Sequence, residues 1–196
     1  MTLKNICVYG AASNNIDEKY IKECEKLGEL MASRGYGLVF GGGKNGVMGA
    51  AARGVRRAGG HITGIAPSFF DIDGVLYTEC DEFIYPDDMH GRKKLFENMS
   101  DACITAPGGI GTLDEFFEFV TLKQLGRINK AIVLLDLFGY YDPLLDMIRH
   151  TVDQKFAGES TFDIFKVCRT NEEALDYIDN YIPAEIDYER KIRGGK

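Results

Sequence analysis

The sequence predicts an α/β protein of one domain, built on a doubly wound, mostly parallel sheet. Short aliphatic runs alternate with amphipathic stretches along the whole chain, which is the pattern of strands and their covering helices. Glycine-rich turns follow two of the aliphatic runs. The length of 196 residues and the hydrophobic content of 45% suit one globular domain. We place that domain at 1–182 and expect a polar tail at 183–196 that is frayed or lies on a partner.

The first half of the chain contains three strands and two helices. We expect strands at 5–9, 37–40 and 61–66, and helices at 17–33 and 46–58. The first helix has an apolar stripe at helical spacing and ends before Gly35. The second helix is rich in small residues, which predicts close packing on its neighbour.

The second half continues the alternation after an irregular insertion at 67–86, which includes a short strand at 82–85. Because long loops often carry function, we expect this insertion to form part of a pocket wall. The remaining predicted strands are at 102–105, 131–136 and 165–168, and the remaining predicted helices are at 87–100, 112–125, 143–156 and 171–180.

Charge and composition exclude several classes of function. The 23 basic and 30 acidic residues give a net charge of −7, which disfavours binding to nucleic acid through a basic surface. No apolar run approaches the length that spans a bilayer, and the N-terminus resembles no leader, so we expect a cytoplasmic protein without membrane contact. Five widely spaced cysteines predict reduced thiols that mostly fill the core, and the scattered histidines and cysteines predict no metal site.

Two glycine clusters follow strands where a doubly wound sheet binds its ligands. Gly108, Gly109 and Gly111 precede Thr112, which we expect to begin a helix with a partial positive charge at its N-terminus. This loop therefore predicts a binding site for one phosphate. In the second cluster, Gly42 and Gly43 form either a tight turn or a further part of the same crevice.

The second cluster also contains the spacing G-x-G-x-x-G, at residues 41–46, which invites a dinucleotide interpretation. It follows the second strand rather than the first, and no acidic residue between 46 and 70 is available for a ribose. A nicotinamide cofactor is therefore disfavoured. The loop after the first strand offers backbone amides and Ser13 to a nucleotide, although a plain turn explains it equally well.

Glu115 and Arg92 are the candidate chemical groups. Glu115 either closes a capping box with Thr112 or provides a carboxylate about one ribose away from the phosphate. Arg92 lies near the start of its helix, where a cation opposes the helix dipole. It belongs either to an exposed basic face or to the site, where it meets a ligand anion or pairs with Glu115.

Three motifs in this order resemble the LOG ("Lonely Guy") phosphoribohydrolases, long labelled possible lysine decarboxylases. Residues 107–115 read PGGIGTLDE and fit the family's PGGxGTxxE. Residues 41–49 are similar to GGGxxGLMG, residues 89–93 are similar to MHxRK, and residues 124–126 match QLG. The resemblance extends over residues 5–180 and implies a Rossmann-like homodimer with no metal or redox cofactor.

The resemblance also implies a reaction, the hydrolysis of the N-glycosidic bond of a nucleoside 5′-monophosphate. The substrate would be AMP or an N6-modified AMP such as a cytokinin nucleotide, and the products a free base and ribose 5-phosphate. Arg92 and Glu115 would be catalytic. The phosphoribose would be held by a larger set: Ser13, Gly42, Gly43, Lys93, Gly108, Gly109, Gly111 and Thr112.

The chain departs from the family pattern in two places. Ala11 and Ala12 stand where the family often has two serines, and the acidic residue expected before MHxRK has two candidates, Asp71 and Asp73. An alternative function is a non-catalytic carrier of a nucleotide or of a molybdopterin-type cofactor, which would return its ligand intact. The joint presence of Arg92 and Glu115 favours the enzyme.

Overall fold

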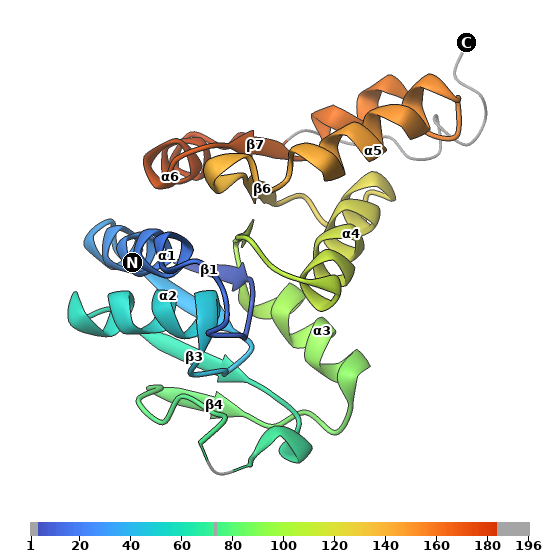
Figure 1. Cartoon of the computed structure of the whole chain (residues 1–196). Helices are drawn as coiled ribbons and strands as arrows, with labels where there is room; N and C mark the ends of the chain where they lie inside the picture. The colour runs from blue at the N-terminus through green and yellow to red at the C-terminus, as the bar shows by residue number, and fades with distance from the viewer. Residues whose placement is uncertain (1–3, 73, 184–196) are drawn as a thin grey trace.

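The computed structural model describes residues 4–72 and 74–183, and in this part of the chain seven strands form one sheet. The strands are β1 (Lys4–Tyr9), β2 (Tyr36–Phe40), β3 (Ile62–Ile65), β4 (Glu82–Ile84), β5 (Ala102–Thr105), β6 (Ala131–Leu135) and β7 (Lys166–Cys168). Their order is β4-β3-β2-β1-β5-β6-β7, and every neighbouring pair is parallel. The predicted doubly wound sheet is confirmed (Figure 1).

Six α-helices accompany the sheet in the described residues. They are α1 (Glu18–Ser33), α2 (Gly46–Arg57), α3 (Met89–Met99), α4 (Ile110–Gln124), α5 (Asp142–Asp153) and α6 (Asn171–Asp179). Short 3-10 turns lie at Ser68–Phe70, Leu137–Gly139 and Glu159–Asp163. The predicted helices are confirmed to within a few residues, but the helix expected from Thr112 begins two residues earlier.

The two faces of the sheet carry separate buried clusters. Alternate side chains of β1 point to opposite faces, as the period of a strand requires. Ile6 and Val8 pack with α1, α2 and α6, whereas Cys7 and Tyr9 pack with α3, α4 and α5. The helices therefore cover both faces, and polar chemistry is left to the loops at the strand ends.

Helices α1 and α2 approach each other at backbone distance, as the small residues of α2 predicted. A Cβ atom on Gly54 would lie 1.9 Å from the Glu25 carbonyl oxygen, and one on Gly28 would lie 2.1 Å from the Ala51 carbonyl oxygen. Both distances are far below van der Waals contact, so only glycine fits at these two positions.

All five cysteines are free, and four of them are buried: Cys7, Cys24, Cys103 and Cys168. Cys80 is partly exposed. The prediction of thiols that mostly fill the core is confirmed. Within the described residues, no helix combines the length and apolar character needed to cross a bilayer. The predicted tail lies outside the described residues except for Pro183.

The direction in which strands are added to the sheet reverses between β1 and β5. From β1 the chain first builds β2, β3 and β4 on one side and then returns to build β5, β6 and β7 on the other. At such a point the loops after neighbouring strands diverge and leave a crevice at the carboxyl ends of the strands.

Candidate active site

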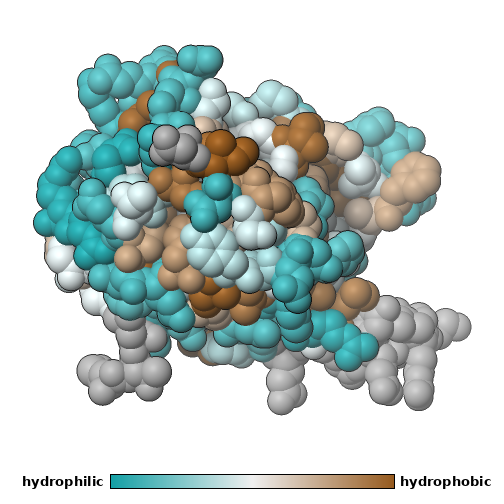
Figure 2. Space-filling model, turned by 90° about the horizontal axis from the view of Figure 1, so that it is seen from below, coloured by the Kyte–Doolittle hydropathy of each residue, from teal (hydrophilic) through white to brown (hydrophobic). Residues whose placement is uncertain are grey.

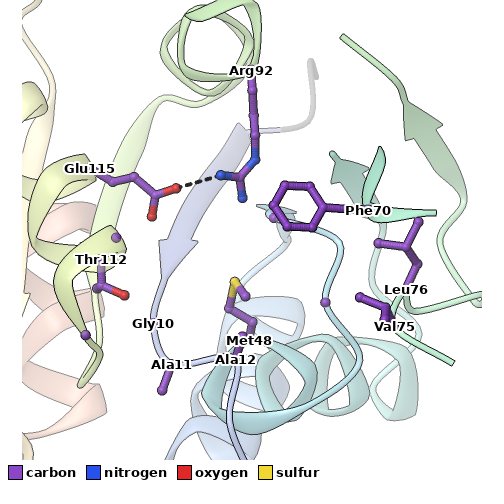
Figure 3. Close-up of a pocket in the computed structure, with 14 residues that line it drawn as sticks. Gly10, Ala11, Ala12, Met48, Phe70, Val75, Leu76, Arg92, Thr112 and Glu115 are labelled. Atoms are coloured by element: carbon purple, nitrogen blue, oxygen red, sulfur yellow. Dashed lines mark hydrogen bonds and ion pairs between the residues drawn. The ribbon is translucent and has the colours of Figure 1, made fainter. Parts of the chain in front are cut away.

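A cavity of about 350 Å³ lies at this crevice. The loop after β1 contributes Gly10, Ala11 and Ala12 to its wall. The other lining residues are Gly41, Gly43, Met48, Phe70, Val75, Leu76, Arg92, Gly109, Gly111, Thr112 and Glu115 (Figure 3). The loops that follow β1, β2 and β5 therefore meet in one place. The insertion at 67–86 supplies part of the wall, as predicted.

The N-terminus of α4 faces this cavity. Gly109 is the N-cap residue, and no side chain of the described residues caps the helix there. The first amide groups of a helix have no partner within the helix, and together they carry a partial positive charge. Gly109, Gly111 and the nearly buried Thr112 all line the cavity, so these amides form the kind of end that binds an anion.

The start of α4 at Ile110 overturns one interpretation of Glu115. A capping box requires Thr112 at the N-cap position, whereas Thr112 lies in the first turn of the helix. Glu115 is therefore one turn further into α4 than a capping role requires, and its side chain points into the cavity (Figure 3).

Glu115 instead forms an ion pair with Arg92 of α3. The Arg92 Nη1 and Glu115 Oε1 atoms are 3.2 Å apart, and the two side chains are 12% and 11% exposed. Arg92 also donates from Nε to the Ile65 carbonyl oxygen at 3.2 Å and lies over the ring of Phe96. The hypothesis that Arg92 pairs with Glu115 is confirmed. The alternative, that Arg92 belongs to an exposed basic face, is wrong.

Burial raises the pKa of Glu115 from 4.5 to about 7, although the Arg92 charge acts in the opposite direction. The desolvation of the carboxylate outweighs the ion pair, because the pair is enclosed on nearly all sides. A carboxyl group that titrates near pH 7 can both hold and release a proton at neutral pH, which is the property of a general acid or base.

Gly41 makes room for this ion pair. A Cβ atom at position 41 would lie 2.3 Å from Arg92 Nη2, so any side chain there would displace the guanidinium. The first glycine of the G-x-G-x-x-G spacing thus lies against a candidate catalytic residue rather than against a dinucleotide.

The N-terminus of α2, in contrast to that of α4, is already occupied by the chain. The amide of Val47 donates to the Ala11 carbonyl oxygen at 2.8 Å, and the amide of Gly46 donates to Asn14 Oδ1 at 2.8 Å. Gly46 has a φ of +62°, and a Cβ there would lie 2.4 Å from the Ala11 oxygen. These contacts leave α4 as the helix whose free N-terminus meets the cavity.

The glycine turn after β2 also holds the wall segment. The Tyr77 amide donates to the Gly42 carbonyl oxygen at 2.8 Å, and the Lys44 amide donates to the Val75 carbonyl oxygen at 3.0 Å. Gly43 and Leu76 form an antiparallel bridge between these two bonds. Val75 and Leu76 are thereby fixed beside Phe70 at the apolar end of the cavity.

Four predicted residues lie in the described part of the chain but outside the cavity wall. The Lys93 ammonium pairs with Asp114 at 2.8 Å and Glu118 at 3.2 Å. The Ser13 hydroxyl accepts a bond from the Asn15 amide. The other two are Gly42 and Gly108.

Sequence reasoning missed the side chain of Met48 and the space that Gly41 leaves. Met48 belongs to the GGGxxGLMG-like segment, so that motif was the available signal. Of the two acidic candidates before α3, Asp71 is exposed and lies outside the cavity wall, and Asp73 lies outside the described residues. Among the described residues, no three His, Cys, Asp or Glu side chains gather as a metal site.

Comparison with known proteins finds similar sequences over most of the chain. A family profile described as possible lysine decarboxylase matches residues 48–178. A cytokinin riboside 5′-monophosphate phosphoribohydrolase of Rhodococcoides fascians is 37% identical over 175 residues, which cover 89% of this chain and 88% of the relative. A second cytokinin riboside 5′-monophosphate phosphoribohydrolase, LOG5 of Arabidopsis thaliana, is 36% identical over 183 residues. The matched residues cover 92% of this chain and 79% of the relative.

Solved structures share the fold at lower identity. The molybdenum cofactor binding protein of Rippkaea orientalis superposes with a TM-score of 0.70 over 91% of this chain and 97% of its own, at 23% identity. At this identity, the similarity shows a common arrangement of strands and helices.

Proposed function

The chain belongs to the LOG family of cytokinin riboside 5′-monophosphate phosphoribohydrolases, and we propose that it hydrolyses the N-glycosidic bond of a nucleoside 5′-monophosphate. The substrate is AMP or an N6-modified AMP such as a cytokinin nucleotide, and the products are the free base and ribose 5-phosphate. The observation that carries the proposal is the enclosed Arg92–Glu115 pair beside the free N-terminus of α4.

The cavity offers three environments in the order that such a substrate needs. The amides at Gly109 and Gly111 suit the 5′-phosphate, because a helix N-terminus stabilises an anion. Arg92 and Glu115 lie next, where the ribose would be. Phe70 and its apolar neighbours lie beyond them and suit a flat, hydrophobic base (Figure 3).

Cleavage of a riboside passes through a state with positive charge on the sugar, which a nearby carboxylate stabilises. In this role Glu115 faces the ribose and accepts a proton from the attacking water. The water oxygen bonds to the anomeric carbon as the bond to the base nitrogen breaks. The leaving base nitrogen takes a proton from solvent, and Glu115 then releases to solvent the proton that it accepted. Arg92 holds the carboxylate at the reaction centre and balances its charge.

We also propose that the protein acts in the cytoplasm as a homodimer, without a metal or redox cofactor. The five free thiols support a reducing compartment.

The support for a dimer is an exposed apolar surface. Large hydrophobic side chains of the insertion, Phe69, Ile72 and Tyr85, are about half exposed or more. Figure 2 shows hydrophobic residues gathered on the face seen from below, which supports an apolar contact with a second copy. Light scattering of the protein as it elutes from a size-exclusion column would report its mass and so distinguish a dimer from a monomer.

The test of the reaction is incubation with AMP, N6-isopentenyl-AMP, GMP and CMP, with the free base followed by chromatography. Glu115→Gln serves as the control, because it keeps the shape of the side chain and removes its charge. Base release by the wild type alone would support the hydrolase and rank the bases. Intact nucleotides throughout, with tight binding, would favour a carrier instead.

A further inference from the structure

Three successive carbonyl groups before α4 are held from outside the loop. The Ala106 oxygen accepts a bond from the Tyr141 hydroxyl at 2.8 Å, and the Pro107 oxygen accepts one from the Ala11 amide at 3.0 Å. The Gly108 oxygen accepts one from the Tyr140 hydroxyl at 2.7 Å. A loop that contains two adjacent glycines is thus fixed by its carbonyl groups.

The last of these bonds determines where an amide points. The peptide unit that joins Gly108 to Gly109 is trans, so its carbonyl oxygen and its N–H point in opposite directions. Tyr140 holds the oxygen on one side, and Gly109 lines the cavity on the other. Neither glycine has a side chain that restricts rotation of this unit, and the Tyr140 hydroxyl holds its oxygen directly.

Tyr140 is itself held in place at some cost in backbone strain. The two residues before it, Phe138 and Gly139, have φ values of 59° and 72°. Phenylalanine rarely adopts this left-handed conformation, because its Cβ is then too close to the backbone. The Tyr140 ring packs edge-on against Tyr20 of α1 at 5.7 Å between ring centroids, and Phe138 packs against the same ring at 5.6 Å. Strain of this kind persists where the surrounding structure requires it, and here it brings a hydroxyl to the loop.

We propose that Tyr140 is a positioning residue that aims the Gly109 amide at the substrate's phosphate. The inference rests on the proposed function, since it assigns the phosphate to this end of the cavity. Tyr140 does not touch the reacting bond, so its effect reaches the substrate through the orientation of one peptide unit.

The neighbouring tyrosine provides a matched control. Tyr141 makes the same kind of bond, to the carbonyl of the unit that joins Ala106 to Pro107. Proline has no amide hydrogen, so this unit presents no donor to a ligand. The Tyr141 hydroxyl also meets the Gly108 amide, but Gly108 does not line the cavity. Tyr140→Phe and Tyr141→Phe therefore each remove one hydroxyl from adjacent positions, but only Tyr140→Phe releases a unit whose amide belongs to a residue of the cavity wall.

The experiment measures binding of the two products, ribose 5-phosphate and adenine, by titration calorimetry. We expect Tyr140→Phe to weaken binding of ribose 5-phosphate about tenfold, as loss of one hydrogen bond would, and to leave adenine unchanged. Tyr141→Phe should leave both affinities unchanged, although its melting temperature should fall because its hydroxyl is buried. With AMP as substrate, Tyr140→Phe should raise KM more than it lowers kcat.

Equal weakening of both products, an unchanged affinity for ribose 5-phosphate, or the same selective loss in Tyr141→Phe would overturn the proposal. Calorimetry does not depend on turnover. If the wild type binds ribose 5-phosphate but releases no base from AMP, the proposed reaction fails while the role of Tyr140 is still tested. If Tyr140→Phe does not fold, Tyr20→Leu tests the same orientation by loosening the ring of Tyr140, with the same selective loss expected.

Discussion

Replacement of Glu115 by glutamine should make the protein more stable as well as inactive. The ionised carboxylate is costly in its enclosed position, since burial raises its pKa from 4.5 to about 7 in spite of the Arg92 charge. Glutamine keeps the shape, can still accept a bond from Arg92, and carries no charge to desolvate. The activity should fall about 10²- to 10⁴-fold, the range for loss of a general acid or base.

The size of the stabilisation depends on pH. Below pH 4.5 the carboxyl group is protonated in both the folded and unfolded states, so it has no effect on stability. Between pH 4.5 and 7 the unfolded state releases the proton while the folded state keeps it, and the wild type loses stability as the pH rises. Above pH 7 the full cost, about 3 kcal/mol, is present.

Urea unfolding of both proteins at pH 5.5 and pH 8 would measure this effect. The advantage of Glu115→Gln should increase by about 2 kcal/mol between these two values. Glu118→Gln is the control, because this residue lies on the same helix in a more exposed ion pair and should change stability by less than about 1 kcal/mol at either pH. An advantage that is the same at both values, or a net loss at pH 8, would refute the reasoning.

Three further predictions follow from the same structure. Arg92→Gln should move the acidic limb of the pH–rate profile to higher pH, because Arg92 lowers the pKa of Glu115; a limb that stays in place would contradict the pairing. Gly54→Ala should destabilise by about 1–3 kcal/mol in urea through its clash between α1 and α2, whereas Gly158→Ala, with ordinary contacts, should be nearly neutral. Phe70→Ala should raise KM for N6-isopentenyl-AMP more than for AMP, about threefold to tenfold, since it removes apolar surface from the base end; equal changes for both substrates would place the base elsewhere.

The sequence was sufficient for the order and type of the main elements, because strands and helices differ in their hydrophobic period. The prediction of a parallel sheet also placed the correct loops together, since the carboxyl ends of parallel strands share one edge of the sheet. The start of α4 was wrong by two residues. Thr112 and Glu115 have the spacing of a capping box, and local sequence does not reveal that Arg92, more than twenty positions away, takes the glutamate instead.

The glycines after β2 show a second limit. Their spacing resembles a phosphate-binding turn, but whether the amides of α2 are free depends on the loop after β1 that packs against them. The same applies to Lys93, whose charge is taken by Asp114 and Glu118 of α4. In each case several polar groups compete for one partner, and tertiary contacts between distant segments decide which of them binds it.

The contrast between the two helix ends determines which nucleotides can compete for the cavity. The N-terminus of α4 offers about half a positive charge, enough to favour one phosphate, while that of α2 is closed by the chain itself. A second or third phosphate would find neither of these two helix ends free to receive it, in a protein whose net charge is already −7. Diphosphates and triphosphates should therefore be poor ligands, and turnover would follow the concentration of the monophosphate rather than that of the whole nucleotide pool.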